Sequence, residues 1–301
     1  MNVKKFFAVF AVSTLVLLCT VIFAGYTYVS HLKIGDGGDI AELDTEVKSH
    51  DRKNVLVIGT DKSGLLADVI MVFSFSDEGD PVNVVSVQRD TEVIVGGRTW
   101  KINSVIQKGK ETFVQMVKDT TGIPIHDYVI VNFKAVQDVV DLLGGVDFYV
   151  PQNMNYDDPE QDLHIHLTEG QQHLNGKKAL ELLRFRGYPM ADIQRTKVQR
   201  DFIQEMFKQK LSLANVTKVE SVFNAVSKNI TSSLTVNEVL DYVSMAKSTE
   251  MQTYEMPCAL TGRGTVRVDS AGMQSLAETH FITEEKYLEQ DAQTDSAQDI
   301  D

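Results

Sequence analysis

Three short apolar runs constrain the fold of this chain more than any other feature of its sequence. They are Asn54–Gly59, Val69–Phe75 and Val82–Val87, and each is rich in β-branched residues with few polar interruptions. Near-continuous apolar runs are typical of strands that are covered on both faces, because a strand with one wet face alternates apolar and polar residues. The chain is therefore predicted to be an α/β protein with a buried sheet.

Helical patterns alternate with further strand-like runs along the rest of the chain. Thr235-Val236-Asn237-Glu238 has the spacing of a capping box and predicts the start of one helix. The longest predicted helix is Ile193–Leu211, and glycine pairs or a Gly-X-Pro sequence end two others. The alternation predicts one domain with a mixed sheet and helices on both sides. Other helices are expected around Phe113–Val117, Val136–Leu143 and Ala179–Leu183, and other strands at Tyr128–Val131, Val146–Val150, Met251–Met256 and Thr265–Val268.

The N-terminus predicts a membrane anchor. Lys4 and Lys5 precede an apolar run from Phe6 to about Gly25, which is long enough for a bilayer core of about 20 residues. The basic flank predicts that the N-terminus is cytoplasmic and the rest extracellular. A cleaved signal peptide is the alternative, but such apolar regions are usually only about 7–15 residues long. The predicted parts are a cytoplasmic N-terminus (1–5), a single transmembrane helix in the plasma membrane (6–29), a linker (30–52), an extracellular domain (53–282) and a disordered acidic tail (283–301).

Charge and cysteine content limit the possible partners. With 29 Lys and Arg against 42 Asp and Glu, the net charge is −13. Sequence-nonspecific nucleic-acid binding depends on a basic surface, so we expect no nucleic-acid partner. Cys19 falls in the predicted membrane span and Cys258 in the soluble part, so no disulfide is expected.

Arginine-rich motifs predict a phosphate-bearing substrate. Arg184 and Arg186 stand two apart, and Asp192 and Arg195 follow at the start of the longest predicted helix. A guanidinium presents a planar fork of donors that matches phosphate oxygens. If the Arg184–Arg186 segment is extended, both side chains point to one face and can meet one ligand.

Two aspartates near the first strand are candidate magnesium ligands. Asp61 follows the first predicted strand and Asp68 precedes the second. Ligands of open α/β sheets collect beyond the carboxyl ends of the strands, and Mg²⁺ usually takes one or two protein oxygens there. Loop capping is the alternative, since aspartate is common in turns.

Three further positions are weaker candidates. Arg89 follows the third strand and could clamp a phosphate while Asp90 holds its guanidinium, although a surface ion pair is the simpler interpretation. Lys101 is a second basic candidate that could equally be a solvated lysine. His164 and His166 could bind zinc from one strand face, but without a third ligand a solvated strand face is favoured.

These motifs have an order along the chain that resembles a known family. The matching segments are Val55–Asp61, Asp68, Val87–Thr91, Lys101–Ser104, Asp141–Val146, Val150-Pro151, Leu174–Leu180, Arg184–Arg186, Asp192 and Arg195. Over roughly residues 54–211 the chain resembles the LytR-CpsA-Psr family of Gram-positive cell-envelope enzymes, and a single N-terminal span also fits that family.

The resemblance implies a fold, an activity and roles for residues. Family members have a three-layer α/β/α sandwich with a hydrophobic tunnel, and they move an anionic glycopolymer from an undecaprenyl-pyrophosphate carrier to peptidoglycan. By this resemblance, Asp61 and Asp68 would hold Mg²⁺. The pyrophosphate would be gripped by several basic residues, and Asp192 would position Arg195 or help activate the acceptor hydroxyl. The basic residues expected to bind the substrate are Arg89, Lys101, Arg184, Arg186 and Arg195.

The chain departs from the family pattern between its first two strands. Ser63 and Leu66-Ala67 stand where family members usually carry arginines, and Gln88 replaces the usual proline before Arg89. These departures leave a second hypothesis open, in which a catalytically weak paralogue binds polyprenyl phosphate as a sensor or assembly factor. Transcriptional regulation is a third interpretation, and the lack of a basic recognition helix argues against it.

Overall fold

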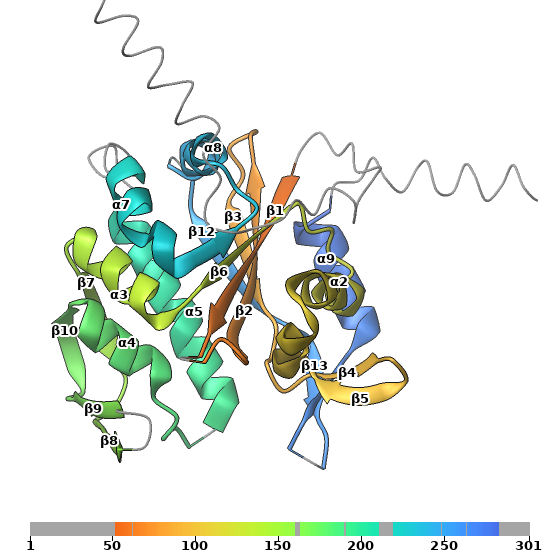
Figure 1. The fold of residues 1–301 in the computed structure, drawn as a ribbon, viewed down its shortest axis with the longest axis horizontal. Helices are drawn as coiled ribbons and strands as arrows, with labels where there is room; N and C mark the ends of the chain where they lie inside the picture. The colour runs from red at the N-terminus through yellow and green to blue at the C-terminus, as the bar shows by residue number, and fades with distance from the viewer. Residues whose placement is uncertain are drawn as a thin grey trace, which may run out of the picture.

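A six-stranded mixed sheet forms the centre of the computed structural model (Figure 1). The structure describes residues 52–61, 63–159, 163–189, 191–210, 219–247, 249–262 and 264–282. Within these ranges no helix is both long and apolar enough to cross a bilayer. The predicted anchor at 6–29, the acidic tail and all of the linker except Arg52 lie outside the described residues.

The strand directions bring several chain segments to one edge of the sheet. The order is β11-β6-β1-β2-β3-β12, with parallel pairing of β1 with β6 and of β3 with β12, and antiparallel pairing elsewhere. The carboxyl ends of β1, β3, β6 and β12 therefore meet the amino end of β2 at one edge, which we call the site edge. The strands are β1 (Arg52–Thr60), β2 (Ala67–Ser76), β3 (Val82–Ser86), β6 (Asp127–Val131), β11 (Ile230–Ser232) and β12 (Met251–Glu255).

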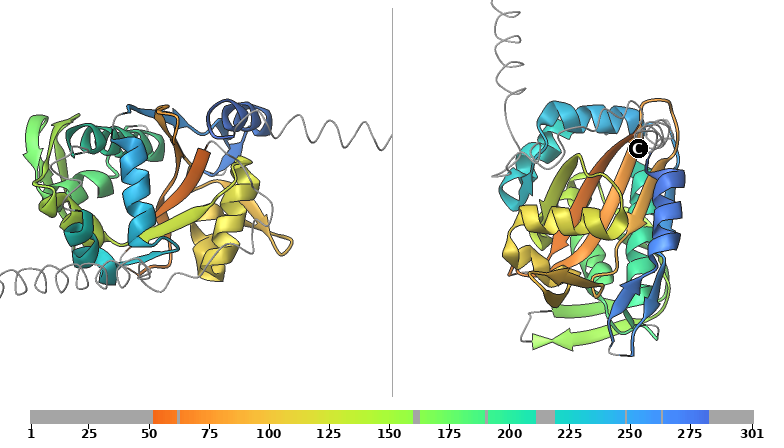
Figure 2. Two further views of the ribbon diagram at one scale, coloured as in Figure 1. Left: turned by 90° about the horizontal axis from the view of Figure 1, so that it is seen from above. Right: turned by 90° about the vertical axis from the view of Figure 1, so that its right-hand side faces the viewer.

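Helices cover both faces of this sheet, as the apolar strand runs predicted (Figure 2). Leu56 and Ile58 of β1 pack in one cluster, and Val55 packs in another with residues of α8. Adjacent residues of a strand point to opposite faces, so a strand with two apolar faces needs two covering layers. One layer holds η2 (Ile102–Lys108), α2 (Lys110–Thr121) and α9 (Ser270–His280), and the other holds α5 (Ala191–Lys210) and α8 (Val236–Ala246).

A second hydrophobic cluster lies beyond α5. Val140, Leu174 and Leu182 are buried there, and Phe148 meets Phe202 of α5 edge to face at 5.6 Å. The cluster joins α3 and α4 closely, since a Cβ on Gly176 would stand 2.2 Å from the Gln137 carbonyl oxygen. Its elements are α3 (Phe133–Leu142), α4 (Gly176–Arg184), β7 (Val146–Val150) with β10 (Gly170–Leu174), and β8 (Met154–Asp158) with β9 (Leu163–Leu167).

Two short hairpins and two small helical elements complete the described fold. The Thr235 side chain accepts from the Glu238 N–H and the Glu238 carboxylate accepts from the Thr235 N–H, which confirms the predicted capping box of α8. The predicted helices and strands are confirmed, with boundaries that differ by a few residues. The hairpins are β4 (Glu92–Val95) with β5 (Arg98–Lys101) and β13 (Cys258–Leu260) with β14 (Val266–Val268), and the remaining elements are α7 (Val219–Val226) and η4 (Ser227–Asn229).

Candidate active site

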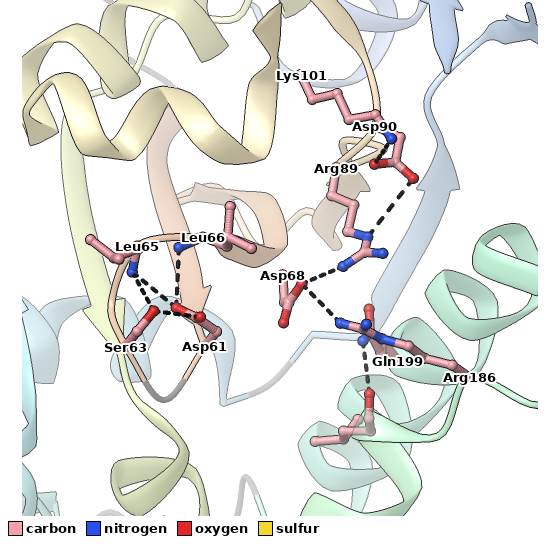
Figure 3. Close-up of polar contacts among 11 residues, drawn as sticks. Asp61, Ser63, Leu65, Leu66, Asp68, Arg89, Asp90, Lys101, Arg186 and Gln199 are labelled. Carbon is pink, nitrogen blue, oxygen red and sulfur yellow. Dashed lines mark hydrogen bonds and ion pairs between the residues drawn. The ribbon is translucent and has the colours of Figure 1, made fainter. Parts of the chain in front are cut away.

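One carboxylate at the site edge joins two arginines from distant parts of the chain. Asp68 is the second residue of β2, and its Oδ1 lies 2.5 Å from Nη1 of Arg89, just after β3. The same oxygen lies 3.6 Å from Nη2 of Arg186 in the connection between α4 and α5 (Figure 3). Asp68 and Arg89 are each 17% exposed, whereas Arg186 is 52% exposed. A solvent-facing guanidinium beside a partly buried one can accept an anion from solution.

The α4–α5 connection is built to present Arg186. Phe185 and Tyr188 are buried and meet edge to face, with ring centroids 4.9 Å apart. Gly187 lies between them, where an added Cβ would stand 2.6 Å from Phe185 Cζ. The two buried rings fix the backbone on either side of Arg186, so its side chain extends to Asp68 without support from a helix or strand.

Asp90 continues the polar cluster on the other side of Arg89. Its Oδ1 lies 2.9 Å from Lys101 Nζ, and its Oδ2 lies 4.0 Å from Arg89 Nε. Lys101 is the last residue of β5, so the β4–β5 hairpin contributes a basic group to the cluster. The predicted role of Asp90 in holding Arg89 therefore has a geometric basis, and Lys101 is ion-paired rather than merely solvated.

The Asp61 carboxylate, by contrast, is engaged by its own loop. Its Oδ1 accepts from the N–H groups of Leu65 at 2.9 Å and Leu66 at 3.1 Å. Its Oδ2 accepts from the Ser63 hydroxyl at 2.6 Å (Figure 3). This is the loop-capping role that was considered as the alternative to metal binding. The short loop that lacks the usual family arginines is thus stabilised by the aspartate at its start.

The remaining oxygens of the two aspartates are of the donor type that magnesium takes. Within the described residues Asp68 Oδ2 makes no hydrogen bond or ion pair, and Asp61 Oδ2 keeps a lone pair beside its bond from Ser63. One oxygen from each would match the small protein contribution that Mg²⁺ usually takes when substrate phosphate completes its shell. No group of three or more His, Cys, Asp or Glu residues suited to a metal occurs in the described ranges.

Arg184 lies at the same edge but does not share the ligand position of Arg186. The segment is not extended throughout, because Arg184 is the last residue of α4, although its cap, Phe185, has extended backbone angles. The Arg184 guanidinium carbon lies 4.5 Å from the ring centroid of Phe133, which begins α3 just beyond the end of β6. The condition under which both arginine forks would point to one face, an extended segment, is therefore not met at Arg184. Arg184 and Arg186 lie on different structural elements of the site.

Helix α5 carries Arg195 to the site edge. Gln204 of α5 donates to the carbonyl of Met251 at the start of β12, and Arg200 pairs with Glu255 at the end of β12. The helix therefore runs antiparallel to β12 and passes its carboxyl end, which places Arg195 beyond the sheet. Arg195 is 3% exposed and close to Tyr188. Burial raises the pKa of Tyr188, and the positive charge of Arg195 opposes that rise. The side chain of Asp192 lies outside the described residues.

Two polar pairs that join α5 to the sheet were not predicted from the sequence. The buried Thr196 hydroxyl donates to Gln88 Oε1 at 3.3 Å, and buried Arg200 pairs with Glu255. Gln88 stands where family members usually have proline, so this departure has a structural role here. Arginine is rarely buried without a partner. The sequence signal for such a partner was a second arginine, Arg200, five residues after Arg195 in the same predicted helix.

The predicted zinc candidates lie on β9. His164 Nδ1 lies 2.6 Å from Asp157 Oδ1 across the β8–β9 hairpin, and His166 Nε2 lies 3.3 Å from the same oxygen. Hydrogen bonding from His164 lowers the pKa of the exposed Asp157. The arrangement matches the favoured interpretation of a solvated strand face.

A mixed α/β sheet with arginines and aspartates gathered beyond its strand ends defines a class of anion-binding α/β proteins. Within that class, the sequence profile described as the LytR_cpsA_psr family matches residues 26–290. The match covers most of the chain, and the chain belongs to this family.

Relatives and solved structures agree with that membership. The chain is 30% identical over 203 residues to the polyisoprenyl-teichoic acid–peptidoglycan teichoic acid transferase TagU of Bacillus anthracis, and the match covers 65% of each chain. The chain thus spans about 65% of the length of this curated relative. The crystal structure of Bacillus subtilis TagV shares the fold at a TM-score of 0.66 and 24% identity, over 78% of this chain and 99% of that one. A structure of TagT bound to LIIa-WTA shares the fold at a TM-score of 0.64 and 19% identity, over 82% of this chain and 96% of that one.

Proposed function

We propose that the protein is a membrane-anchored phosphotransferase that attaches an anionic glycopolymer to peptidoglycan. The glycopolymer would be carried on undecaprenyl pyrophosphate, in assembly of the cell wall or capsule. Residues 6–29 would hold the chain in the plasma membrane, with the catalytic domain outside the cell. The single observation that carries the proposal is the Asp68–Arg89–Arg186 cluster, supported by relatives whose names describe transfer of teichoic acid from a polyisoprenyl carrier.

Phosphoryl transfer requires what this cluster offers. The acceptor hydroxyl oxygen would form a bond to the phosphorus that bears the glycopolymer, while the bond from that phosphorus to the bridging oxygen breaks. Undecaprenyl phosphate leaves, and the acceptor proton passes to a base or to water. Catalysis of such a step depends mainly on positioning and on neutralising charge at phosphate oxygens. Arg89 and Arg186 would supply this neutralisation, with Arg195 and Arg184 further along the site edge.

Asp68 would hold the two arginines in place until the substrate binds. Without substrate its negative charge balances two guanidinium groups, which keeps them close together in spite of their mutual repulsion. When a pyrophosphate arrives, its oxygens can take over the guanidinium donors. Asp68 and Asp61 would then hold Mg²⁺, which supplies further charge neutralisation when bound. Asp192 would position Arg195 or help activate the acceptor hydroxyl, as the family resemblance implies.

A transfer assay with the full chain tests the proposal. The purified protein would be incubated with a polyprenyl-pyrophosphate-linked glycopolymer and peptidoglycan, with Mg²⁺ or with EDTA. The proposal predicts polymer attached to peptidoglycan only when Mg²⁺ is present. Attachment that is equally fast in EDTA would show that transfer does not need Mg²⁺. Tight binding of the carrier without transfer would contradict the proposal that the protein is an enzyme.

One observation favours the second candidate function, a sensor or assembly factor that binds polyprenyl phosphate without turnover. Three hydrogen bonds within its own loop occupy Asp61, so binding of Mg²⁺ there competes with loop capping. If Mg²⁺ does not displace these hydrogen bonds, the arginines would bind phosphate but would not promote transfer. In the assay above, this candidate predicts saturable binding of the carrier and no attached polymer at any Mg²⁺ concentration.

A further inference from the structure

Two hairpins beside the candidate site expose large aliphatic side chains. Ile94 on β4 is 71% exposed and Leu260 on β13 is 69% exposed. Leu65, in the loop that Asp61 caps, is 54% exposed. Singly exposed aliphatic residues are common on protein surfaces. These three, however, come from separate connections at the same end of the molecule.

The structure ties these three connections together. The Leu65 carbonyl accepts from the Gln107 side chain of η2 at 3.0 Å, and η2 directly follows β5. On the other side, the Val266 N–H donates to the Asp90 carbonyl at 3.0 Å, which joins the β13–β14 hairpin to the start of β4. Both hairpins project from the lower end of the molecule in Figure 1, and the right-hand view of Figure 2 agrees. The three exposed aliphatic residues therefore lie on connected segments next to the site edge.

The β4–β5 hairpin and the segments beside it carry more basic than acidic side chains, although the chain is strongly acidic. Residues 89–110 carry five basic and only two acidic side chains, against a net charge of −13 for the whole chain. Arg98 is exposed beside the Gly96-Gly97 turn, whose positive φ angles of 57° and 75° make a tight two-residue hairpin. Arg267 on β14 is 74% exposed and lies 3.5 Å from Glu92 of β4, and Lys108 lies over the Trp100 ring at 4.5 Å.

We propose that the β4–β5 and β13–β14 hairpins form a surface that docks on an anionic lipid bilayer. Exposed aliphatic residues flanked by basic ones are the combination that binds peripheral proteins to anionic membranes, because apolar side chains enter the headgroup region while cations meet lipid phosphates. An anionic glycan would explain the basic residues but would leave Ile94 and Leu260 without a partner. The inference adds a lipid surface to the proposed function, and its test does not depend on turnover.

Docking in this orientation turns the site edge toward the membrane. Arg52 begins β1 at the opposite edge, so the chain enters the domain on the side away from the bilayer. A linker of the length predicted for residues 30–52 can extend by roughly 3.3 Å per residue, which is enough to pass beside a domain whose first strand has nine residues. The lipid carrier could then reach Arg186 without leaving the bilayer surface.

Fluorescence quenching by brominated lipids tests the docking surface in the full chain. Trp100 is the only tryptophan, so Trp100→Phe provides a background for a single reporter at Ile94→Trp or Leu260→Trp. Asp77→Trp, in the exposed β2–β3 turn at the opposite edge, is the matched control. In nanodiscs that contain phosphatidylglycerol and brominated acyl chains, we expect quenching at positions 94 and 260 to exceed that at 77 by at least about twofold.

Charge-reversal variants and discs without anionic lipid complete the experiment. Arg98→Glu combined with Arg267→Glu should reduce the quenching at Ile94→Trp, and so should discs without phosphatidylglycerol, whereas Lys247→Glu on the far end should not. Equal quenching at positions 94 and 77 would overturn the proposal. It would also be overturned if the position 94 reporter responded to a soluble anionic glycopolymer and not to brominated lipid.

Discussion

Asp61 and Asp68 lie at the two ends of one loop, yet their surroundings differ completely. Asp61 accepts hydrogen bonds from Ser63, Leu65 and Leu66 within a few residues of itself. Asp68 instead pairs with Arg89 after β3 and Arg186 beyond α4. Both carboxylates belong to the same sheet edge, and only Asp68 is held by residues that the tertiary fold brings together.

The difference separates two uses of aspartate at a strand end. A carboxylate that accepts backbone N–H groups stabilises its own loop and needs no ligand to be satisfied. A carboxylate between two guanidinium groups keeps like charges together, and such an arrangement has little structural value unless an anion later joins it. We therefore expect changes around Asp68 to affect activity and changes at Asp61 to affect mainly stability and metal binding.

The largest effect is expected from Arg186→Ala. The side chain is half exposed, so its removal should leave the melting temperature unchanged while one charged phosphate contact is lost. Hydrogen bonds to charged groups contribute about 1.5–3 kcal/mol, which corresponds to a loss of roughly 10- to 150-fold in transfer rate. Lys197→Ala, an exposed lysine of α5, is the matched control and should retain full activity. Full transfer activity in Arg186→Ala would contradict the role assigned to the Asp68 cluster.

Metal titrations of two amide variants sharpen the comparison. Asp68→Asn removes the charge that holds Arg89 and Arg186 and one proposed metal oxygen, so we expect a loss in transfer rate of about 10- to 100-fold. Asp61→Asn keeps the loop bonds, because an amide oxygen can accept from Leu65 and Leu66, but it removes an anionic metal ligand. We expect its transfer rate to recover at higher Mg²⁺ concentration. If the Mg²⁺ dependence of Asp61→Asn matches that of the unaltered protein, Asp61 is a loop cap alone.

A smaller effect on stability is expected from Asp61→Ala. This change leaves the Leu65 and Leu66 N–H groups without their acceptor, and comparable capping losses cost about 0.5–2 kcal/mol. For a domain of this size we expect the melting temperature to fall by about 2–4 °C per kcal/mol, whereas Asp61→Asn should stay within a degree or so. Calorimetry of the two variants provides the measurement. Equal melting temperatures for Asp61→Ala and Asp61→Asn would show that the loop does not depend on this side chain.

The smallest effect is expected at the histidines of β9. His164 and His166 share Asp157 on an exposed face, where ion pairs contribute little. We expect His164→Ala, and addition of EDTA without Mg²⁺ in the buffer, to leave the melting temperature unchanged within experimental error. A drop in melting temperature with EDTA that disappears in His164→Ala would instead reveal a structural metal on this strand.

Local patterns in the sequence predicted most of the fold. The apolar runs at Asn54–Gly59 and Val82–Val87 require a sheet covered on both faces, and the Thr235 capping box fixes the start of α8 because its hydrogen bonds lie within four residues. The gathering of Asp68 and Arg89 at one edge follows from the pairing of β2 with β3, since in an antiparallel pair the start of one strand lies beside the end of the other.

The detailed geometry of the site could not be predicted in the same way. The contact of Arg186 with Asp68 depends on how α4 and α5 pack and on the buried pair Phe185 and Tyr188, which no local pattern encodes. An extended segment would place Arg184 and Arg186 on one face, but α4 continues through Arg184, and the ring of Phe133 from another helix lies against its guanidinium. Such contacts are set by the tertiary fold.

A crystal structure of the protein with a bound polyprenyl pyrophosphate tests the central claim most directly. The account predicts phosphate oxygens within about 3.2 Å of the guanidinium nitrogens of both Arg89 and Arg186, with their contacts to Asp68 lengthened or lost. The Asp61 bonds to Leu65 and Leu66 should remain. A pyrophosphate bound elsewhere, with Asp68 still joined to both arginines, would contradict the account.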